Sequence, residues 1–332
     1  MDNSFTDVEG IKVGHYTDLE NITGCTVILC PKGAVAGVDQ RGGAPGSREL
    51  ALLNPINQVQ EVHAILLSGG SAYGLDAASG VMRYLEENDI GVNVGSAKVP
   101  IVPAAIILDL GIGNAKIRPT SDNAYTACQN ATDSVREQGS IGAGTGATVG
   151  KLLGMGSAMK AGLGMASIEI GKGVVVSAIM VVNAVGEIID PKSNQVLAGA
   201  RNPEIAKKVL NKKEMFVNSL ELMRGPIGRT IFDLAAPSNT VIGVVATNAR
   251  LNKIQATKVA QMAQNGLART IRPTNTMLDG DTMFALSTGK KKINPNIIGA
   301  FATEVVSTAI INAVQYAKGL GGIPGIADLN QS

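Results

Sequence analysis

The chain has 332 residues, a formal net charge of +2 at pH 7 and only 17% charged residues, fewer than the roughly 25% usual in globular domains. Hydrophobic residues make up 45% and glycines number 40, so the composition is not that of a disordered chain and predicts closely packed elements. Aromatic residues make up 3% and tryptophan is absent, which argues against a basic, aromatic-lined surface for nucleic acid.

The chain start and the cysteines indicate the cytoplasm. Residues 1–7 are acidic and polar, unlike a signal peptide. The apolar stretch 173–182 is shorter than the ~20 residues that a membrane helix needs. Cys25, Cys30 and Cys128 are odd in number and show no paired spacing, as is typical of a reducing compartment. We therefore expect a cytoplasmic protein with neither a membrane nor a nucleic acid as partner.

Hydrophobic periodicity predicts strands and helices along the whole chain. In chain order they are strands at 24–29, 34–38 and 63–67, a helix at 74–87, a strand at 104–110, a helix at 123–138 ended by a glycine, a glycine-rich loop at 142–150, strands at 157–170 and 174–184, a polar segment at 200–224, a strand at 241–247, a helix at 253–270, a strand near 282–287 and a helix at 295–318.

This order of elements predicts the architecture. Helices come in pairs between blocks of strands, which suits a sandwich of sheets with helices on both outer faces. The polar segment 200–224 reads as an insertion or as an exposed loop with a helix. No internal repeat and no clear linker divides the chain, so we expect a single domain over residues 1–332.

Several familiar motifs fail on inspection. The loop at 144–151 resembles a phosphate-binding loop, but Thr145 and Leu152 stand where the Walker motif needs Gly and Ser or Thr, and Val149 replaces the third glycine of a dinucleotide fingerprint. Nucleotide binding through residues 142–151 is therefore disfavoured. Residues 69–73 miss a nucleophile elbow because Tyr73 stands where glycine is required.

The chain has two histidines, His15 and His63, and both read as structural. A Ser-His-Asp triad and a histidine-rich zinc site are therefore hard to build, and a hydrolase would need another base. The α-amine of an N-terminal Thr or Ser, with a pKa near ~8, can take that part once the chain is cut before it. Thr240 follows Asn239 and opens an apolar strand, as such a site requires, although an ordinary turn entering a strand has the same pattern.

Further motifs make the chain resemble the DmpA-type aminopeptidase family, whose members include β-peptidyl aminopeptidases and the nylon-oligomer hydrolase NylC. The matching stretches occur in the family's order along most of the chain, at 39–46, 68–77, 103–110, 142–147, 181–186, 239–240 and 277–285.

The resemblance implies an α+β fold, a four-layer αββα sandwich like that of the N-terminal-nucleophile hydrolases and the ornithine acetyltransferases. It implies self-cleavage between Asn239 and Thr240, giving chains 1–239 and 240–332 that stay in one folded unit. It also implies a homo-oligomer, with a tetramer favoured, and no cofactor or metal. The low charge content agrees with surface hidden between subunits.

The resemblance carries the family's roles to individual residues. Thr240 matches the nucleophile. Asp279 and Asp281 match an acidic pair, and because residues i and i+2 of an extended segment point to one side, both carboxylates are expected to face Thr240. Without the resemblance, the pair would read as a solvated turn. The pair would orient the hydroxyl, hold the protonated amine or bind the free amine of a substrate.

Three more residues receive roles from the resemblance. Asn183 would donate to the oxyanion, or else satisfy the backbone. Lys151 would lower the pKa of the amine or polarise the carbonyl, or else lie at the surface. Tyr73 would hydrogen-bond near the nucleophile or simply pack. Weaker candidates, which read as structural, are Ser71, Arg41 and Lys160.

The expected function is hydrolysis of amide bonds in small peptides or oligoamides. Members that gave the family its name use Ser as nucleophile, with Ser-Gly-Glu where this chain has residues 279–281 as Asp-Gly-Asp. Because of this difference, we expect amide hydrolysis in general rather than a specific aminopeptidase activity. The alternative is a non-catalytic, unprocessed binding or assembly protein on the same fold.

Overall fold

The computed structural model describes residues 3–202, 215–233 and 239–329. Its strands are β1 (Lys12–Asp18), β2 (Thr23–Gln40), β3 (Ser47–Arg48), β4 (Glu61–Ser68), β5 (Val92–Asn93), β6 (Lys98–Val99), β7 (Ala104–Ile106), β8 (Thr148–Val149), β9 (Met159–Lys160), β10 (Leu163–Glu169), β11 (Val175–Asn183), β12 (Glu187–Ile189), β13 (Val196–Ala198), β14 (Thr240–Ala249), β15 (Ile271–Arg272) and β16 (Thr282–Lys291). Its helices are α1 (Ala77–Glu87), α2 (Ser121–Gln129), α4 (Ser219–Arg224), α5 (Pro226–Asp233), α6 (Lys253–Thr270), α7 (Pro295–Gln315) and α8 (Ile326–Leu329), with 3-10 turns η1 (Phe5–Asp7), η2 (Leu50–Leu53), η3 (Ser71–Asp76), η4 (Gly142–Gly144) and η5 (Met155–Ser157).

The main sheet is continuous, and the long strand β2 connects its two halves. Among the described residues its order is β10-β11-β14-β16-β2-β4-β7-β3, and β1 also pairs with β2. The first part of β2 pairs with β1 and β4, whereas its last part pairs with β16. A register shift between Leu29 and Ala34 separates the two parts. One strand thus belongs to both halves of the sheet.

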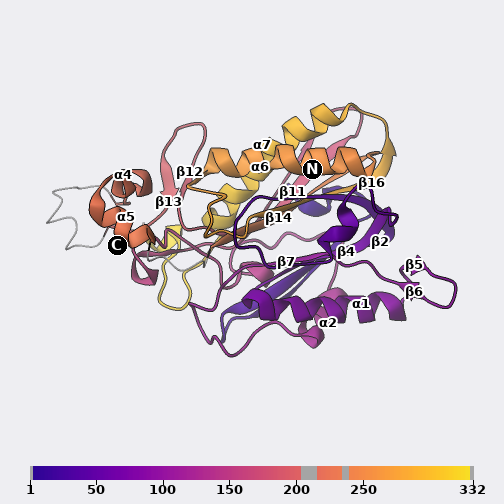
Figure 1. Cartoon of the computed structure of the whole chain (residues 1–332), viewed down its shortest axis with the longest axis horizontal. Coiled ribbons are helices and arrows are strands. Elements are labelled where there is room, and N and C mark those ends of the chain that lie inside the picture. Colours follow the sequence, from indigo (N-terminus) through magenta and orange to yellow (C-terminus); the bar gives the residue numbers. More distant parts are fainter. Residues whose placement is uncertain (1–2, 203–214, 234–238, 330–332) are drawn as a thin grey trace.

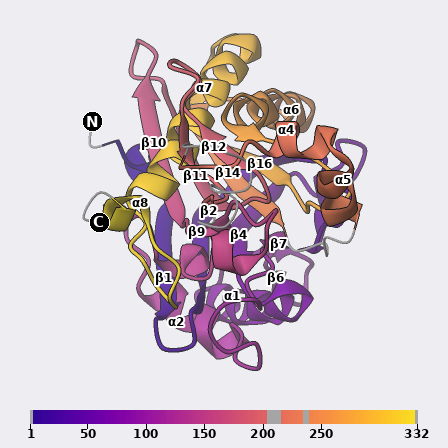
Figure 2. The same cartoon turned by 90° about the vertical axis from the view of Figure 1, so that its left-hand side faces the viewer.

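Three apolar clusters show that the two halves face each other in a sandwich. One lies between α6, α7 and the half formed by β10, β11, β14 and β16. The second lies between the two halves, and the third joins β2, β4 and β7 to α1 and α2. Figure 1 shows α6 and α7 above the strands and α1 and α2 below, and Figure 2 shows the same layers end on. The expected four-layer αββα sandwich is confirmed.

The alternation of residues along β14 explains why this strand lies in the middle. Val241 and Val245 pack in the cluster under α6 and α7. Ile242, Val244 and Ala246 point the other way, into the cluster between the sheet halves. Both faces of the strand are therefore buried, so the backbone of its first residue is held from two sides.

Most predicted elements are confirmed, and the exceptions have local causes. The runs 24–29 and 34–38 are one strand rather than two, because the strand continues past Gly33, at φ +78°, through an irregularity instead of turning. The helix expected at 123–138 ends at Gln129, because Thr132 pairs with Val13 of β1. The strand expected at 104–110 keeps only Ala104–Ile106.

The strand expected at 157–170 is divided because its two parts pair with different strands, β9 with β8 and β10 with β11. Gly162 lies between them, against the backbone of Gly139, where a side chain would not fit. The polar segment 200–224 lies partly outside the described residues, and its described end holds α4.

Helix α7 is long and apolar enough to cross a membrane by length and composition, with a mean hydropathy of 1.7 over its most apolar window. The sequence analysis predicted a helix at 295–318 but considered only the stretch 173–182 as a possible membrane span. Of that window, 61% is buried inside the fold, where α7 packs on β10, β11 and α6. The apolar surface of α7 is thus largely covered by its own chain.

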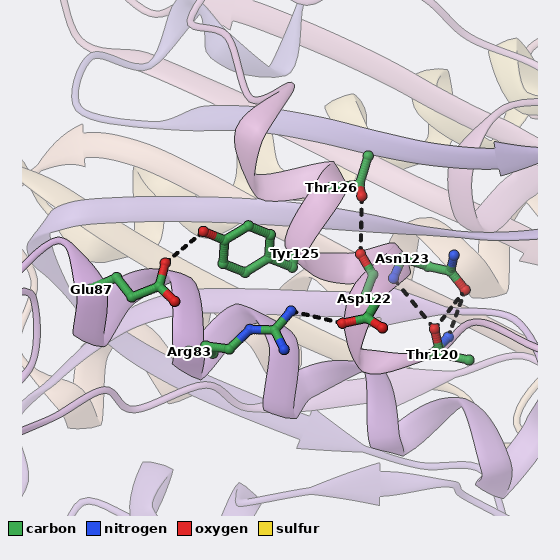
Figure 3. Close-up of polar contacts among 7 residues, drawn as sticks. All are labelled: Arg83, Glu87, Thr120, Asp122, Asn123, Tyr125 and Thr126. Atoms are coloured by element: carbon green, nitrogen blue, oxygen red, sulfur yellow. Dashed lines mark hydrogen bonds and ion pairs between the residues drawn. The ribbon is translucent and has the colours of Figure 1, made fainter.

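Polar contacts join α1 and α2 in the opposite outer layer (Figure 3). Arg83 of α1 pairs with Asp122 of α2 at 2.8 Å, and its guanidinium lies 4.6 Å from the ring centre of Tyr125. The Tyr125 hydroxyl donates to Glu87 at 2.5 Å. Such exposed pairs contribute little to stability because water screens them, so the apolar cluster of β2, β4, β7, α1 and α2 is the main stabilising contact between this layer and the sheet.

Candidate active site

The first residue of β14 lies where three chain segments meet. Asn239 and Thr240 are 3% and 4% exposed. Thr240 pairs with Asn183, the last residue of β11, and Asn239 forms a bridge with Asp279, just before β16. Because β14 is parallel to β16 and antiparallel to β11, the start of the first two and the end of the third share one end of the sheet.

The carbonyl oxygen of Asn239 accepts two hydrogen bonds. The backbone N–H of Gly280 donates to it at 3.0 Å, and the hydroxyl of Thr240 also donates to it. A side chain at Gly280 would place its Cβ 3.0 Å from the Thr240 hydroxyl oxygen and 2.9 Å from the Ala44 carbonyl. Glycine is therefore required for the backbone to approach this closely.

Asp281 holds the backbone on the other side of Thr240. Its Oδ1 accepts the N–H of Val241 at 2.7 Å, and its Oδ2 accepts the hydroxyl of Thr274 and the N–H of Asn275, both at 2.8 Å. Burial and the neighbouring Asp279 raise the pKa of Asp281 to about 6, although these hydrogen bonds oppose the shift.

The carboxylate of Asp279 is held by a different residue. Its Oδ2 accepts the N–H and the hydroxyl of Thr276 at 2.8 and 2.6 Å. Burial raises the pKa of Asp279, and the bonds from Thr276 and the charge of Lys151 oppose that shift. Within the described residues, no hydrogen bond joins either carboxylate of the acidic pair to the Thr240 hydroxyl. The expected direct orientation of that hydroxyl is not what this single, uncut chain shows.

Gly42 and Gly43 allow the loop at residues 41–46 to lie directly against the segment that carries Asp279 and Asp281. The N–H groups of Arg41 and Ala44 donate to the carbonyls of Asp281 and Asp279 at 3.0 and 2.8 Å. A Cβ on Gly42 would lie 2.3 Å from the carbonyl oxygen of Asp279. The motif at 39–46 therefore fixes the backbone around Gly280, and the Arg41 side chain pairs outward with Asp39.

Asn183 is fully buried and its amide is fixed by its partners. Its Oδ1 accepts the Lys151 ammonium at 2.8 Å and the N–H of Thr148 at 3.1 Å, so its Nδ2 is the donor, directed at the Leu108 carbonyl at 3.0 Å. Burial lowers the pKa of Lys151 to about 7, against the charges of Asp279 and Asp109, which raise it. Lys151 is thus half-buried in the site, not a free surface residue.

Lys160, a weak candidate in the sequence, lies fully buried beneath the glycine-rich loop. Its ammonium donates to the carbonyls of Ala147 and Ala161 at 2.7 and 2.6 Å and to that of Gly144 at 3.3 Å. Burial lowers its pKa to about 7, and the charge of Asp109 opposes this. These contacts hold the loop that carries Thr148 against β11, which is a structural role.

We expect Lys160→Met to make the protein's stability less dependent on pH. Between pH 7 and 10.5 the unfolded chain keeps a proton on Lys160 that the folded chain has lost, so the free energy of unfolding rises with pH in this range. The variant loses this contribution, and its deficit in melting temperature relative to wild type should widen from pH 7 to 9.5, by about 1–3 °C per pH unit.

The measurement is thermal unfolding across this pH range, with the exposed Lys318→Met as the control. Lys318→Met should keep a constant offset from wild type, because its side chain lies in water in both states. Parallel curves for Lys160→Met and wild type would contradict the lowered pKa.

The remaining sequence candidates lie at the edge of the site. Ser71 adopts φ +55° at the start of η3, and its N–H donates to the Ile107 carbonyl at 3.0 Å. Tyr73 is 62% exposed and carries the Arg118 guanidinium 4.0 Å from its ring centre. No described hydrogen bond connects Tyr73 to Thr240, so its role near the nucleophile stays a prediction.

The sequence analysis did not identify some residues that take part in the site. Thr274 and Thr276 each hold one carboxylate of the acidic pair, and Gly280 binds the Asn239 carbonyl. Asp109, 4% exposed, accepts the N–H of Gly70 at 2.7 Å and the hydroxyl of Thr23 at 2.8 Å. Asp109 and Gly280 lie inside the matched stretches 103–110 and 277–285, so the motifs could have indicated both residues as parts of the site. Thr274 and Thr276 lie just before the second stretch, and no motif indicated them.

The described residues contain no group of three or more His, Cys, Asp or Glu side chains that could hold a metal ion. Within the same residues, the charged groups of the site include Asp109, Asp279, Asp281 and Lys151, and all four are engaged in hydrogen bonds. What the arrangement offers chemically is a hydroxyl beside a carbonyl whose oxygen already has a backbone donor.

Comparison with known proteins agrees with the family that the sequence motifs indicated, and the match extends over almost the whole chain. A model of peptidase family S58 matches residues 3–327. An uncharacterized aminopeptidase of Mycobacterium tuberculosis (strain ATCC 25618 / H37Rv) is 41% identical over 350 aligned positions, covering 98% of each protein. The 6-aminohexanoate-oligomer endohydrolase of Kocuria sp. (strain KY2) is 30% identical, covering 93% of this chain and 85% of that protein.

Two solved structures share the fold. The L-aminopeptidase D-Ala-esterase/amidase of Ochrobactrum anthropi, described as a variant of the Ntn hydrolase fold, aligns with a TM-score of 0.70 at 20% identity, covering 97% of this chain and 88% of that one. A Burkholderia sp. beta-aminopeptidase aligns with a TM-score of 0.69 at 22% identity, covering 100% and 93%. The sandwich described above is therefore an Ntn-hydrolase fold.

Proposed function

Because the chain belongs to peptidase family S58 and is an amide-bond hydrolase, we propose that Thr240 is its nucleophile and that self-cleavage after Asn239 frees it. The proposal is supported most by one arrangement. The hydroxyl of Thr240 lies against the carbonyl of Asn239, and the N–H of Gly280 already donates to that carbonyl oxygen at 3.0 Å.

Self-cleavage would proceed by an N-to-O acyl shift. The Thr240 hydroxyl oxygen attacks the Asn239 carbonyl carbon, its proton passes to the departing Thr240 nitrogen, and the C–N bond breaks to leave an ester. The negative charge that develops on the Asn239 oxygen is stabilised by the Gly280 N–H. Water then hydrolyses the ester, giving an Asn239 carboxylate and a free α-amine on Thr240.

In the mature enzyme the same hydroxyl would attack the carbonyl of an amide substrate. The α-amine of Thr240, with a pKa near ~8, takes the hydroxyl proton and passes it to the leaving amine. Water releases the acid from the acyl-enzyme by the reverse proton route. Asp281 would keep the backbone on the C-terminal side of Thr240 in place through the N–H of Val241.

Asn183 and Lys151 would serve the oxyanion of the substrate. The Asn183 amide donates to the Leu108 carbonyl in this structure, and the proposed role of the same amide is to donate to the oxyanion when a substrate is bound. Lys151 fixes the orientation of that amide through its Oδ1. With a pKa lowered to about 7, Lys151 can also exchange a proton near neutral pH.

The proposed substrates are linear amides, either short peptides or oligoamides. The family relatives are called aminopeptidases or an endohydrolase of 6-aminohexanoate oligomers, and an open-chain amide is what these names share. We also propose a cytoplasmic homo-oligomer, with a tetramer favoured. Its support is the low charge content and the three buried, free thiols.

Mass spectrometry of the purified protein tests these proposals together. Denaturing analysis is expected to find two chains, 1–239 and 240–332, the second with Thr240 as its first residue. Native spectra of the same sample should show both chains in one particle, at the mass of four copies of each. A single full-length chain that hydrolyses peptide amides would refute the nucleophile, whereas a particle of another size would refute only the tetramer.

A further inference from the structure

A cleft lies at the other end of β14 from Thr240. Its volume is about 900 Å³, and it is lined by the ends of β14 and β16, the start of α6 and the irregular part of β2. Since β14 has ten residues and a strand rises about 3.3 Å per residue, this cleft is roughly 30 Å from the nucleophile. It therefore cannot take part in the reaction at Thr240.

The cleft is strongly basic although the chain as a whole is almost neutral. Five cationic side chains line it, and the acidic residue among its lining is Glu61. The cationic residues are Lys32, Arg250, Lys253, Lys290 and Lys292.

Four of these cations have no carboxylate partner. Within the described part of the chain, the side chains of Lys32, Arg250, Lys290 and Lys292 make neither an ion pair nor a hydrogen bond. Elsewhere on the surface, cations such as Arg269 do pair with acids, at 2.5 Å in that case. Unpaired like charges that share one hollow repel each other and favour a counter-ion.

The fifth cation is built into the floor of the cleft. Lys253 is 4% exposed, and its ammonium donates to the carbonyls of Leu52, Asn57 and Val59 at 2.9 to 3.0 Å. These contacts satisfy its hydrogens but leave its positive charge without a compensating carboxylate in the described structure. Burial lowers the pKa of Lys253 from the ordinary value of a lysine, so the four exposed cations contribute more of the positive charge of the cleft than Lys253 does.

The first turn of α6 adds to the positive potential. The helix has 18 residues and begins at Lys253, after the N-cap Asn252. The Asn252 side chain accepts the N–H of Gln255, whereas the N–H groups of Lys253 and Ile254 donate to no described acceptor. The helix dipole and these N–H groups favour an anion at this place.

We propose that this cleft binds a small, multiply charged phosphate anion of about the size of a triphosphate. Several separate ammonium groups suit phosphate oxygens that spread in three dimensions, and the cleft lies in the size range of small-molecule sites. A single phosphate would leave most of the cations unpaired. The site is independent of the proposed nucleophile, so either proposal can fail alone.

Calorimetric titration of the purified protein with inorganic tripolyphosphate tests the site. We expect one anion per chain, with affinity that weakens as NaCl is raised from 50 to 200 mM. The double variant Lys290→Gln/Lys292→Gln should lose at least tenfold in affinity. The variant Glu61→Gln should bind about three- to tenfold more tightly, because it removes the negative charge from the cleft.

Removing equal charge elsewhere provides the control. The variant Lys116→Gln/Lys318→Gln changes exposed lysines outside the cleft and should bind as wild type does. The absence of binding to wild type, or an equal loss in both double variants, would overturn the proposal. Citrate binding as tightly as tripolyphosphate would overturn the assignment to phosphate. Thermal unfolding of each variant confirms that the fold is intact.

Discussion

Replacing Thr240 by valine is expected to leave the chain uncut and to abolish amide hydrolysis. Valine has nearly the shape of threonine and keeps the methyl group that packs at the start of β14, but it lacks the hydroxyl that lies against the Asn239 carbonyl. Neither the acyl shift nor attack on a substrate can begin without that oxygen. Loss of a nucleophile of this kind costs about 10⁶-fold in kcat in a well-studied hydrolase.

The measurement pairs a denaturing gel with hydrolysis of a 6-aminohexanoate oligomer and of an aminoacyl anilide. Thr240→Ser is the matched control, since it keeps the hydroxyl and loses only a methyl group, and it should both cut itself and turn over substrate. A Thr240→Val protein that still separates into two chains would remove Thr240 from the mechanism. A cut but inactive Thr240→Ser would show instead that the methyl group positions the hydroxyl for turnover.

The core of the fold could be predicted from the sequence, because its elements bury long apolar runs. The strand at 241–247 and the helix at 253–270 match β14 and α6 closely. Nearly every residue of β14 is buried, and α6 buries one face along its whole length. Family membership was also predicted correctly from the order of the motifs. The extent of β2 was not, because Pro31 and Gly33 resemble a turn and only pairing with distant strands shows that the strand continues.

The site could be predicted less completely, for a geometric reason. Sequence spacing placed Asp279 and Asp281 on one side of an extended segment, but the structure turns one carboxylate toward Thr276 and the other toward Val241. Such partners depend on how separate loops pack, which no local pattern records. The sequence motifs indicate which segments form the site, but the direction of each side chain can be seen only in the folded structure.

Replacing Gly280 by alanine is expected to slow self-cleavage about 10²–10³-fold, which is the usual cost of removing one donor from an oxyanion. The new Cβ would lie 3.0 Å from the Thr240 hydroxyl oxygen and 2.9 Å from the Ala44 carbonyl. The Ala44 backbone is tied to Asp279 by its own N–H, so it cannot easily move away. The Gly280 N–H must shift instead, and the Asn239 oxygen loses its backbone donor.

The time course of the full-length band during cell-free synthesis measures this rate, and thermal unfolding of the Thr240→Val background with and without the change checks the fold. Gly156→Ala is the control glycine, because a Cβ there meets nothing within 4 Å and its backbone does not need a positive φ. It should cut as fast as wild type. If Gly280→Ala also does so, the Gly280 N–H is not what stabilises the charge on Asn239. A slowed Gly280→Ala beside a normal Gly156→Ala would tie the rate to that one backbone donor, since the nucleophile and the acidic pair are unchanged in both.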